Sequence, residues 1–443
     1  MFSRRDLSRL LVPLIIEQVL AVLVGMADVV MVAAVGEAAV SGVSLVDSIS
    51  LLIIQLLAAL ATGGAVVCSQ YLGRKEPKQA CVAANQLLLS TVLLSVVIMA
   101  VALIGSKPLL RLIFGNIAPD VMQNAEIYFF LSALSYPFLA VYNSCAALYR
   151  SMGNSKVSMK TSLCMNGINI AGNAICVFGL HMGVEGVGIP TVISRATAAI
   201  IMLVIVRNEN NVIHIDRKLR LGVHPTMIRN ILRIGVPAGM ENSMFQLGKI
   251  LVQSLVATLG TASIAGFAVA GNLVNFEYLP GTAIGLGMVT VIGQCVGAGE
   301  YEQARQYTKS LIKLNYLILA ALAVLLSLLA GPLVSIYNLS PEAASIAEQL
   351  ILVHSVAMLV WPISFALPNT LRAATDVKFT MLTSIFSMWA FRIGMSYVLV
   401  LVCGWGVMGV WIAMFIDWAF RAALFAWRFH SGKWIARSIP EAS

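Results

Sequence analysis

Charged residues are scarce in this sequence of 443 residues. Asp, Glu, Lys and Arg together make up 11% of the chain, whereas 59% of the residues are hydrophobic. A soluble domain has about 25% charged residues, so this small charged fraction could not cover a surface in contact with water. The composition therefore excludes a soluble protein and predicts an integral membrane protein whose first partner is the lipid bilayer.

Common catalytic motifs are also missing. No phosphate-binding G-x-x-x-x-G-K-[ST] loop occurs, since Gly248-Lys249 is followed by Ile250, and there is no H-E-x-x-H motif. The chain thus lacks the loop that serves ATP hydrolysis, and we expect neither an enzyme nor a bound cofactor or metal centre. The seven cysteines form no C-x-x-C pair and are interpreted as small packing residues. Residues 1–9 contain no small-residue cleavage site, which indicates a retained first span.

Long apolar runs fill most of the chain. A span needs about 20 mostly apolar residues, and by this rule the sequence predicts twelve transmembrane helices. The connections are too short for a folded domain outside the membrane, so we predict an all-α membrane protein. The expected spans are 10–35, 44–71, 84–106, 124–149, 157–180, 186–206, 228–258, 263–296, 310–331, 344–371, 379–402 and 405–428.

The second half of the sequence repeats the first. Residues 13–17 (PLIIE) return as 237–241 (PAGME), and residues 70–73 (QYLG) return as 294–297 (QCVG). Repeated halves are typical of transporters with the substrate path between two lobes. We predict an amino-terminal lobe (1–206), a linker (207–227), a carboxyl-terminal lobe (228–430) and a short tail (431–443).

The basic residues predict the orientation. One set of loops holds 23 of the 29 Lys and Arg residues, whereas the opposite set has only Lys107 and Arg111. Cytoplasmic loops are rich in Lys and Arg, so we expect both termini and the linker to be cytoplasmic. Membrane topology then accounts for the net charge of +9, and no nucleic-acid partner is expected.

Polar residues at membrane depth mark a candidate ion site. Asp28 lies in the first span among apolar residues, and Asn169 and Asn173 share a face of the fifth span with Asn166 close to it. Burial favours the neutral form of a carboxyl group, so Asp28 could bind and release a proton. Amide oxygens near a carboxylate also suit Na⁺, and Thr191 could add a hydroxyl. The alternatives are an Asp paired near the outer surface and amides that only join helices.

The second lobe contains Glu241 in the seventh span and Glu277 in the eighth. These carboxylates either attract cationic substrates in a central cavity or pair with Lys249. We interpret Asp417 and Arg421, four residues apart, as a structural pair that Arg392 could join. The further candidates for the cavity lining are Gln55, Asn166, Gln246 and Asn272.

Proline and glycine predict the local shape of several spans. Pro13, Pro137, Pro237, Pro280 and Pro362 lie within spans and should kink or break them. Bent helices that can straighten offer one route to alternating access. Gly-x-x-x-Gly pairs begin at residues 235, 281 and 293 and indicate close helix packing.

Taken together, the chain resembles the multidrug and toxic compound extrusion (MATE) transporters, over essentially its whole length. The strings that carry the resemblance are Pro13 with Asp28, and residues 69–73, 169–179, 183–194 and 294–299. The resemblance implies export of drugs in exchange for Na⁺ or H⁺. It also implies a coupling-ion site at Asp28, Asn169, Asn173 and Thr191. This chain has Asn173 where many members have Asp, which removes one charge from that site.

We therefore expect a bacterial inner-membrane antiporter, monomeric, that exports amphipathic and cationic small molecules in exchange for H⁺ or Na⁺. A flippase for lipid-linked precursors, from the same superfamily, is the alternative. A passive channel is a third class, and concentrative transport would exclude it. A Na⁺ site, if present, would use Asp28, Asn169 and Asn173.

Overall fold

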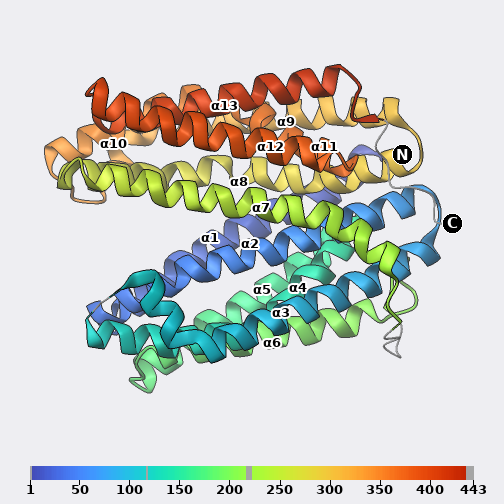
Figure 1. The fold of residues 1–443 in the computed structure, drawn as a ribbon, viewed down its shortest axis with the longest axis horizontal. Helices are drawn as coiled ribbons and strands as arrows, with labels where there is room; N and C mark the ends of the chain where they lie inside the picture. Colours follow the sequence, from blue (N-terminus) through green and yellow to red (C-terminus); the bar gives the residue numbers. More distant parts are fainter. Residues whose placement is uncertain (1, 116–117, 216–221, 436–443) are drawn as a thin grey trace. The chain divides into compact units, whose positions relative to one another are not determined.

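The computed structural model describes residues 2–115, 118–215 and 222–435. The chain divides into two compact units, residues 2–239 and residues 240–443, and the division falls inside one helix. Over the described residues the structure is helical, which confirms the predicted all-α class (Figure 1). The predicted linker and tail extend into residues 216–221 and 436–443, so Arg217, Lys218, Arg220 and Arg437 lie outside the described residues.

The helices of the first unit follow the predicted spans but are longer. They are α1 (Arg4–Ala33), α2 (Glu37–Gly73), α3 (Pro77–Phe114), α4 (Pro119–Ser151), α5 (Ser155–Ala174) with a π-helical end (Ile175–Gly179), and α6 (Glu185–Val206). α4 packs against α2, α3 and α6, and α1 packs against α5. This arrangement brings the polar residues of α1, α5 and α6 to one place.

The helix that contains the division is α7 (Pro225–Ala257). The second unit then has α8 (Thr261–Gly297), α9 (Tyr301–Ser335) and α10 (Pro341–Ala357). A π-helical segment (Pro362–Ala366) leads into α11 (Leu367–Ala373). The next span combines α12 (Val377–Ser387) with π-helical segments at Met388–Met395 and Val398–Val402, and the last described helix is α13 (Gly406–His430).

Length and composition support the predicted number of spans. Among the described residues, ten helices are long and apolar enough to cross a membrane, and the bent pair Pro341–Ala357 and Pro362–Ala373 adds an eleventh. α7 is not in that set; it is 33 residues long and contains Arg229, Arg233, Glu241 and Lys249. Large apolar side chains such as Ile104 (87% exposed) and Leu328 (75% exposed) point outward, as expected of helices in contact with lipid.

Of the five prolines expected to kink or break helices, Pro362 breaks one. The helix axis bends by 68° between α10 and the segment that begins at Pro362. The helices continue through Pro13, Pro137, Pro237 and Pro280 without interruption. A proline can kink a helix while leaving it continuous, so kinks at Pro13 and Pro237 stay a prediction.

Glycines allow α2 and the first half of α7 to approach closely within the first unit. A Cβ atom on Gly63 would lie 2.7 Å from the Ile231 carbonyl oxygen and 2.8 Å from the Gly235 backbone nitrogen. A Cβ atom on Gly235 would lie 3.0 Å from Leu60 Cα, and one on Gly239 would lie 2.9 Å from Leu56 Cδ1. The predicted role of the pair that begins at residue 235 is confirmed, because small residues there let two backbones meet.

Candidate functional site

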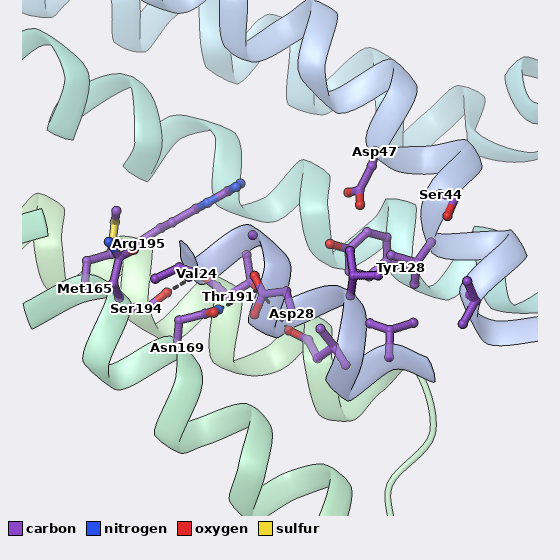
Figure 2. A pocket seen from close by; sticks show the side chains of 17 residues that line it. Val24, Asp28, Ser44, Asp47, Tyr128, Met165, Asn169, Thr191, Ser194 and Arg195 are labelled. Atoms are coloured by element: carbon purple, nitrogen blue, oxygen red, sulfur yellow. Dashed lines mark hydrogen bonds between the residues drawn. The ribbon is translucent and has the colours of Figure 1, made fainter. Parts of the chain in front are cut away.

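The first unit contains a partly open cavity of about 240 Å³ that several polar side chains line. Residues of α1, α2, α4, α5 and α6 line it, with aliphatic side chains such as Val24 and Val187 between the polar ones. Figure 2 shows Asp28, Asn169 and Thr191 close together at one side of this cavity, and Asp47 with Tyr128 at the other. Drug-sized molecules need roughly 300–1,000 Å³, so this cavity fits an ion with a small group rather than a whole drug.

Asp28 belongs to a chain of hydrogen bonds that joins three helices. Asn173 Nδ2 donates to Asp28 Oδ1 at 2.8 Å and lies 3.4 Å from Asn169 Oδ1. Asn169 Nδ2 donates to Thr191 Oγ1 at 3.1 Å, and Thr191 donates to the Val187 carbonyl oxygen at 2.9 Å. The four residues predicted to form the coupling-ion site are thus brought together.

The donor set of this cluster suits a small hard cation. Asn173 is fully buried, and its Oδ1 atom has no hydrogen-bond partner. A buried oxygen without a partner is costly, and a cation or a proton on the neighbouring carboxylate would compensate for it. Na⁺ prefers such oxygen ligands, so Asp28, Asn173 and Asn169 could hold it, while Asp28 alone could hold a proton.

Asn166, one turn before Asn169 on α5, has a different place. It lines the same cavity, but its amide nitrogen lies 3.4 Å from Ser162 Oγ rather than bonding to Asp28. Gln55 does not line this cavity; it is partly buried on α2.

Sequence reasoning missed the two ionisable residues Asp47 and Arg195 of the cavity, and Tyr128 beside Asp47. Asp47 on α2 accepts a hydrogen bond from Tyr128 on α4 and lies near enough to Asp28 to interact with it electrostatically. Arg195 on α6 donates from Nη1 to Ser135 Oγ at 2.6 Å and faces both carboxylates electrostatically. Two carboxylates and one guanidinium leave the cavity one negative charge when both acids are ionised. The missed signal was available, because Asp47 and Arg195 are ionisable residues within predicted spans.

The predicted acids of the second lobe have partners other than Lys249. Arg372 Nη2 donates to Glu241 Oε1 at 2.7 Å, and His354 Nδ1 lies 2.8 Å from Glu277 Oε2. Gln246 is partly buried on α7 and Asn272 is exposed on α8. A role for these four residues in a substrate cavity stays a prediction.

The structural pair predicted from the sequence is present. Arg421 Nε donates to Asp417 Oδ1 at 2.8 Å, and Arg392 Nη1 lies 3.8 Å from Asp417 Oδ2. Asp417 is fully buried, so its charge is compensated by two guanidinium groups at once.

Comparison with known families agrees with this arrangement. The MatE family model matches residues 13–175 and again residues 237–398. The chain belongs to the MatE family. The two matches start at the prolines of the repeated segments, Pro13 and Pro237, so the family repeat coincides with the internal repeat of this MatE protein.

Curated relatives match this MatE protein along nearly its whole length. The uncharacterized transporter YisQ of Bacillus subtilis is 29% identical over 96% of this chain and 94% of that protein. The probable multidrug resistance protein NorM of Thermotoga maritima is 25% identical over 98% of this chain and 94% of that protein. The protein is therefore a multi-pass membrane transporter of the MATE multidrug efflux family, and by family it is not an enzyme.

Solved structures share the fold of this MatE protein. One is the outward-facing conformation of a multidrug resistance MATE transporter of the MOP superfamily, with a TM-score of 0.91 at 20% identity, covering 97% of this chain and 96% of that one. Another is a MOP superfamily transporter from Pyrococcus furiosus, with a TM-score of 0.89 at 20% identity and the same coverage. The twelve-helix layout in two repeated lobes fits these structures.

Proposed function

We propose that this protein is a secondary active antiporter that exports amphipathic and cationic small molecules in exchange for H⁺ or Na⁺. The observation that carries the proposal is the bond between Asn173 and Asp28 inside the polar cavity. This bond supports the proposal because it brings Asp28, which lines the cavity, next to amide groups whose oxygens suit Na⁺ or a protonated carboxyl group. We further propose that the protein works as a monomer in the bacterial inner membrane with both termini cytoplasmic, and without a cofactor.

The chain's own residues would couple the two fluxes through preferential binding. With a cation on Asp28, the net negative charge of the cavity is neutralised. The bond from Asn173 holds the carboxylate in place, and Asn173 itself lies 3.4 Å from Asn169 Oδ1. Without a bound cation, the cavity keeps one uncompensated negative charge. If the ion and the solute favour different conformations, each shifts the equilibrium between those conformations by the difference between its affinities for the two. Such differences are sufficient for coupled transport.

The test is concentrative transport by the purified protein in proteoliposomes. Ethidium accumulation is measured under an imposed pH gradient and, separately, under an imposed Na⁺ gradient, for the wild type, Asp28→Asn and Asp120→Asn. Asp120 is the matched control because it is exposed at the start of α4 and its carboxylate accepts a bond from the neighbouring Val121 nitrogen. We expect accumulation under one gradient with the wild type and the control, and none with Asp28→Asn. Folded Asp28→Asn protein that still concentrates ethidium would refute the role of Asp28.

A further inference from the structure

Basic side chains gather around one aromatic ring in the second unit. Lys249 Nζ lies 5.2 Å from the centroid of the Phe245 ring, Arg392 Cζ lies 5.1 Å from it, and Arg421 Cζ lies 5.7 Å from it. Most Lys and Arg residues of the chain lie in loops or at helix ends. Arg195 and these three residues are among those that lie within helices, away from the helix ends. We call Lys249, Arg392 and Arg421 with Phe245 the basic cluster.

The basic cluster lies well inside the membrane-spanning helices. Arg392 lies ten positions before the end of the span at Val402, and Lys249 lies eight positions before the end of α7 at Ala257. At 1.5 Å per residue these are about 15 and 12 Å of helix. Charged side chains at such depth are expensive, and they mark substrate or ion pathways by default.

Nearby acids do not balance this cluster. Asp417 contacts Arg421 at 2.8 Å and Arg392 at 3.8 Å, so one carboxylate forms ion pairs with two of the three cations. Glu241 and Glu277 have other partners at close range, because Glu241 binds Arg372 at 2.7 Å and Glu277 lies 2.8 Å from His354. Within the part of the chain that the structure describes, Lys249 makes no ion pair.

Arg392 is buried with donors that have no acceptor. The residue is 8% exposed, and its Nε and Nη1 atoms have no hydrogen-bond partner. Its Nη2 atom reaches only the Met414 sulfur, at 3.1 Å. A guanidinium group prefers a carboxylate or phosphate held by two parallel bonds. An incoming anionic group would supply the missing acceptors.

Aromatic side chains lie next to the basic cluster. The Phe365 ring is 6.3 Å from the Phe245 ring and is stacked on Trp361 at 5.2 Å. Trp361 in turn stacks on Tyr278 at 5.9 Å between ring centroids. Lys249 itself is exposed, so a solute could reach its charge and lie beside these rings.

We propose that the basic cluster binds the carboxylate of an aromatic solute, so that the exported class includes zwitterions with a free acid group. This inference rests on the proposed efflux function and names the solute chemistry at a second place in the same protein. Lys249 provides the accessible charge, Arg392 provides donors that have no acceptor, and the aromatic side chains contact the ring system. The cavity at Asp28 keeps its separate role for the cation.

The test compares two dyes that differ at one group. Rhodamine 110 has a free carboxylate, and rhodamine 123 is its methyl ester. Binding to the purified full chain in phosphatidylcholine nanodiscs is followed by fluorescence polarisation. We expect the wild type to prefer rhodamine 110, and the ratio of the two affinities to fall about tenfold in Lys249→Gln. Lys249→Arg keeps the charge and should keep the ratio, as should Lys313→Gln, which removes an exposed lysine of α9.

Three outcomes would overturn the proposal. They are a wild type without preference for the free carboxylate, a Lys249→Gln variant with an unchanged ratio, and loss of the preference when phosphatidylglycerol is added to the nanodiscs. The last would assign the cluster to lipid phosphates. Failure of the proposed efflux function is measured in a separate experiment, the gradient-driven accumulation of rhodamine 123. That accumulation depends on Asp28 and does not depend on the ratio of the two dye affinities. Thermal unfolding of each variant shows whether it is folded.

Discussion

Glu277 on α8 and His354 on α10 form a hydrogen bond of 2.8 Å between side chains that are almost fully buried. The imidazole lies among the rings of Trp411, Trp418 and Phe415, with centroids 5.2, 5.5 and 6.3 Å away. Because Glu277 contacts His354 inside this shell of aromatic rings, a solute has little access to the Glu277 carboxylate. The geometry therefore favours a structural role for Glu277 over its predicted place in a substrate cavity.

We expect His354→Ala to destabilise the protein by about 3–5 kcal/mol, because removing one partner leaves the other buried and unpaired. Glu277→Gln should cost less, and the double variant should cost less than the two single variants together. Thermal unfolding followed by tryptophan fluorescence measures all three. If the costs simply add, the two side chains are not coupled and the structural role is wrong.

The contact between Asn173 and Asp28 leads to a second prediction. Asn173→Asp would place another carboxylate beside Asp28, whose Oδ1 atom now lies 2.8 Å from the Asn173 amide nitrogen. Two adjacent carboxylates repel each other unless a cation lies between them, so Na⁺ affinity should rise at least about tenfold. The Na⁺ concentration for half-maximal transport in proteoliposomes measures this.

The matched control for that variant is Asn166→Asp on the same helix. Asn166 lines the same cavity but contacts Ser162 rather than Asp28. It adds the same charge without adjoining the proposed ion site, so its Na⁺ dependence should stay close to that of the wild type. Equal behaviour of the two variants would argue for a general effect of cavity charge instead of a specific ion site.

Close packing of α2 on α7 gives a third prediction. Gly63→Ala would introduce a Cβ atom 2.7 Å from the Ile231 carbonyl oxygen, and a backbone atom cannot move aside as a flexible side chain can. We expect a loss of about 1–3 kcal/mol from overpacking, measured as a lower unfolding temperature. Gly271→Ala on α8 is the control, since its Cβ atom would meet nothing within 4 Å. An unchanged unfolding temperature for Gly63→Ala would show that the helices can separate at no cost.

Much of the fold was predictable because lipid imposes simple rules on composition. Span positions and the repeat follow from apolar length and from matching strings, and the family model repeats at the same two prolines. Helix ends were less predictable. α3 runs from Pro77 to Phe114, whereas the apolar run covers only 84–106, because turns that contain Lys78 at one end and Lys107 and Arg111 at the other continue the helix beyond that run.

The candidate site was predictable only in part. The resemblance brought Asp28, Asn169, Asn173 and Thr191 together, whereas Asp47 and Arg195 were overlooked although both lie in predicted spans. The partners of the second-lobe acids could not be predicted from spacing. Glu241 meets Arg372, which is 131 positions away, and only tertiary packing selects that arginine over the nearer Lys249.

The π-helical stretch Met388–Met395 has an effect that reaches beyond its eight residues. A π turn accommodates one additional residue, and each residue of an α-helix turns the chain by about 100°. The direction of the Arg392 side chain is thus set by backbone winding as well as by side-chain identity. Loss of a single amino acid from this stretch would swing the guanidinium away from Phe245 while every neighbouring side chain stayed chemically the same. Homologues that differ here by an insertion or a deletion would then differ in the polarity they present to a solute.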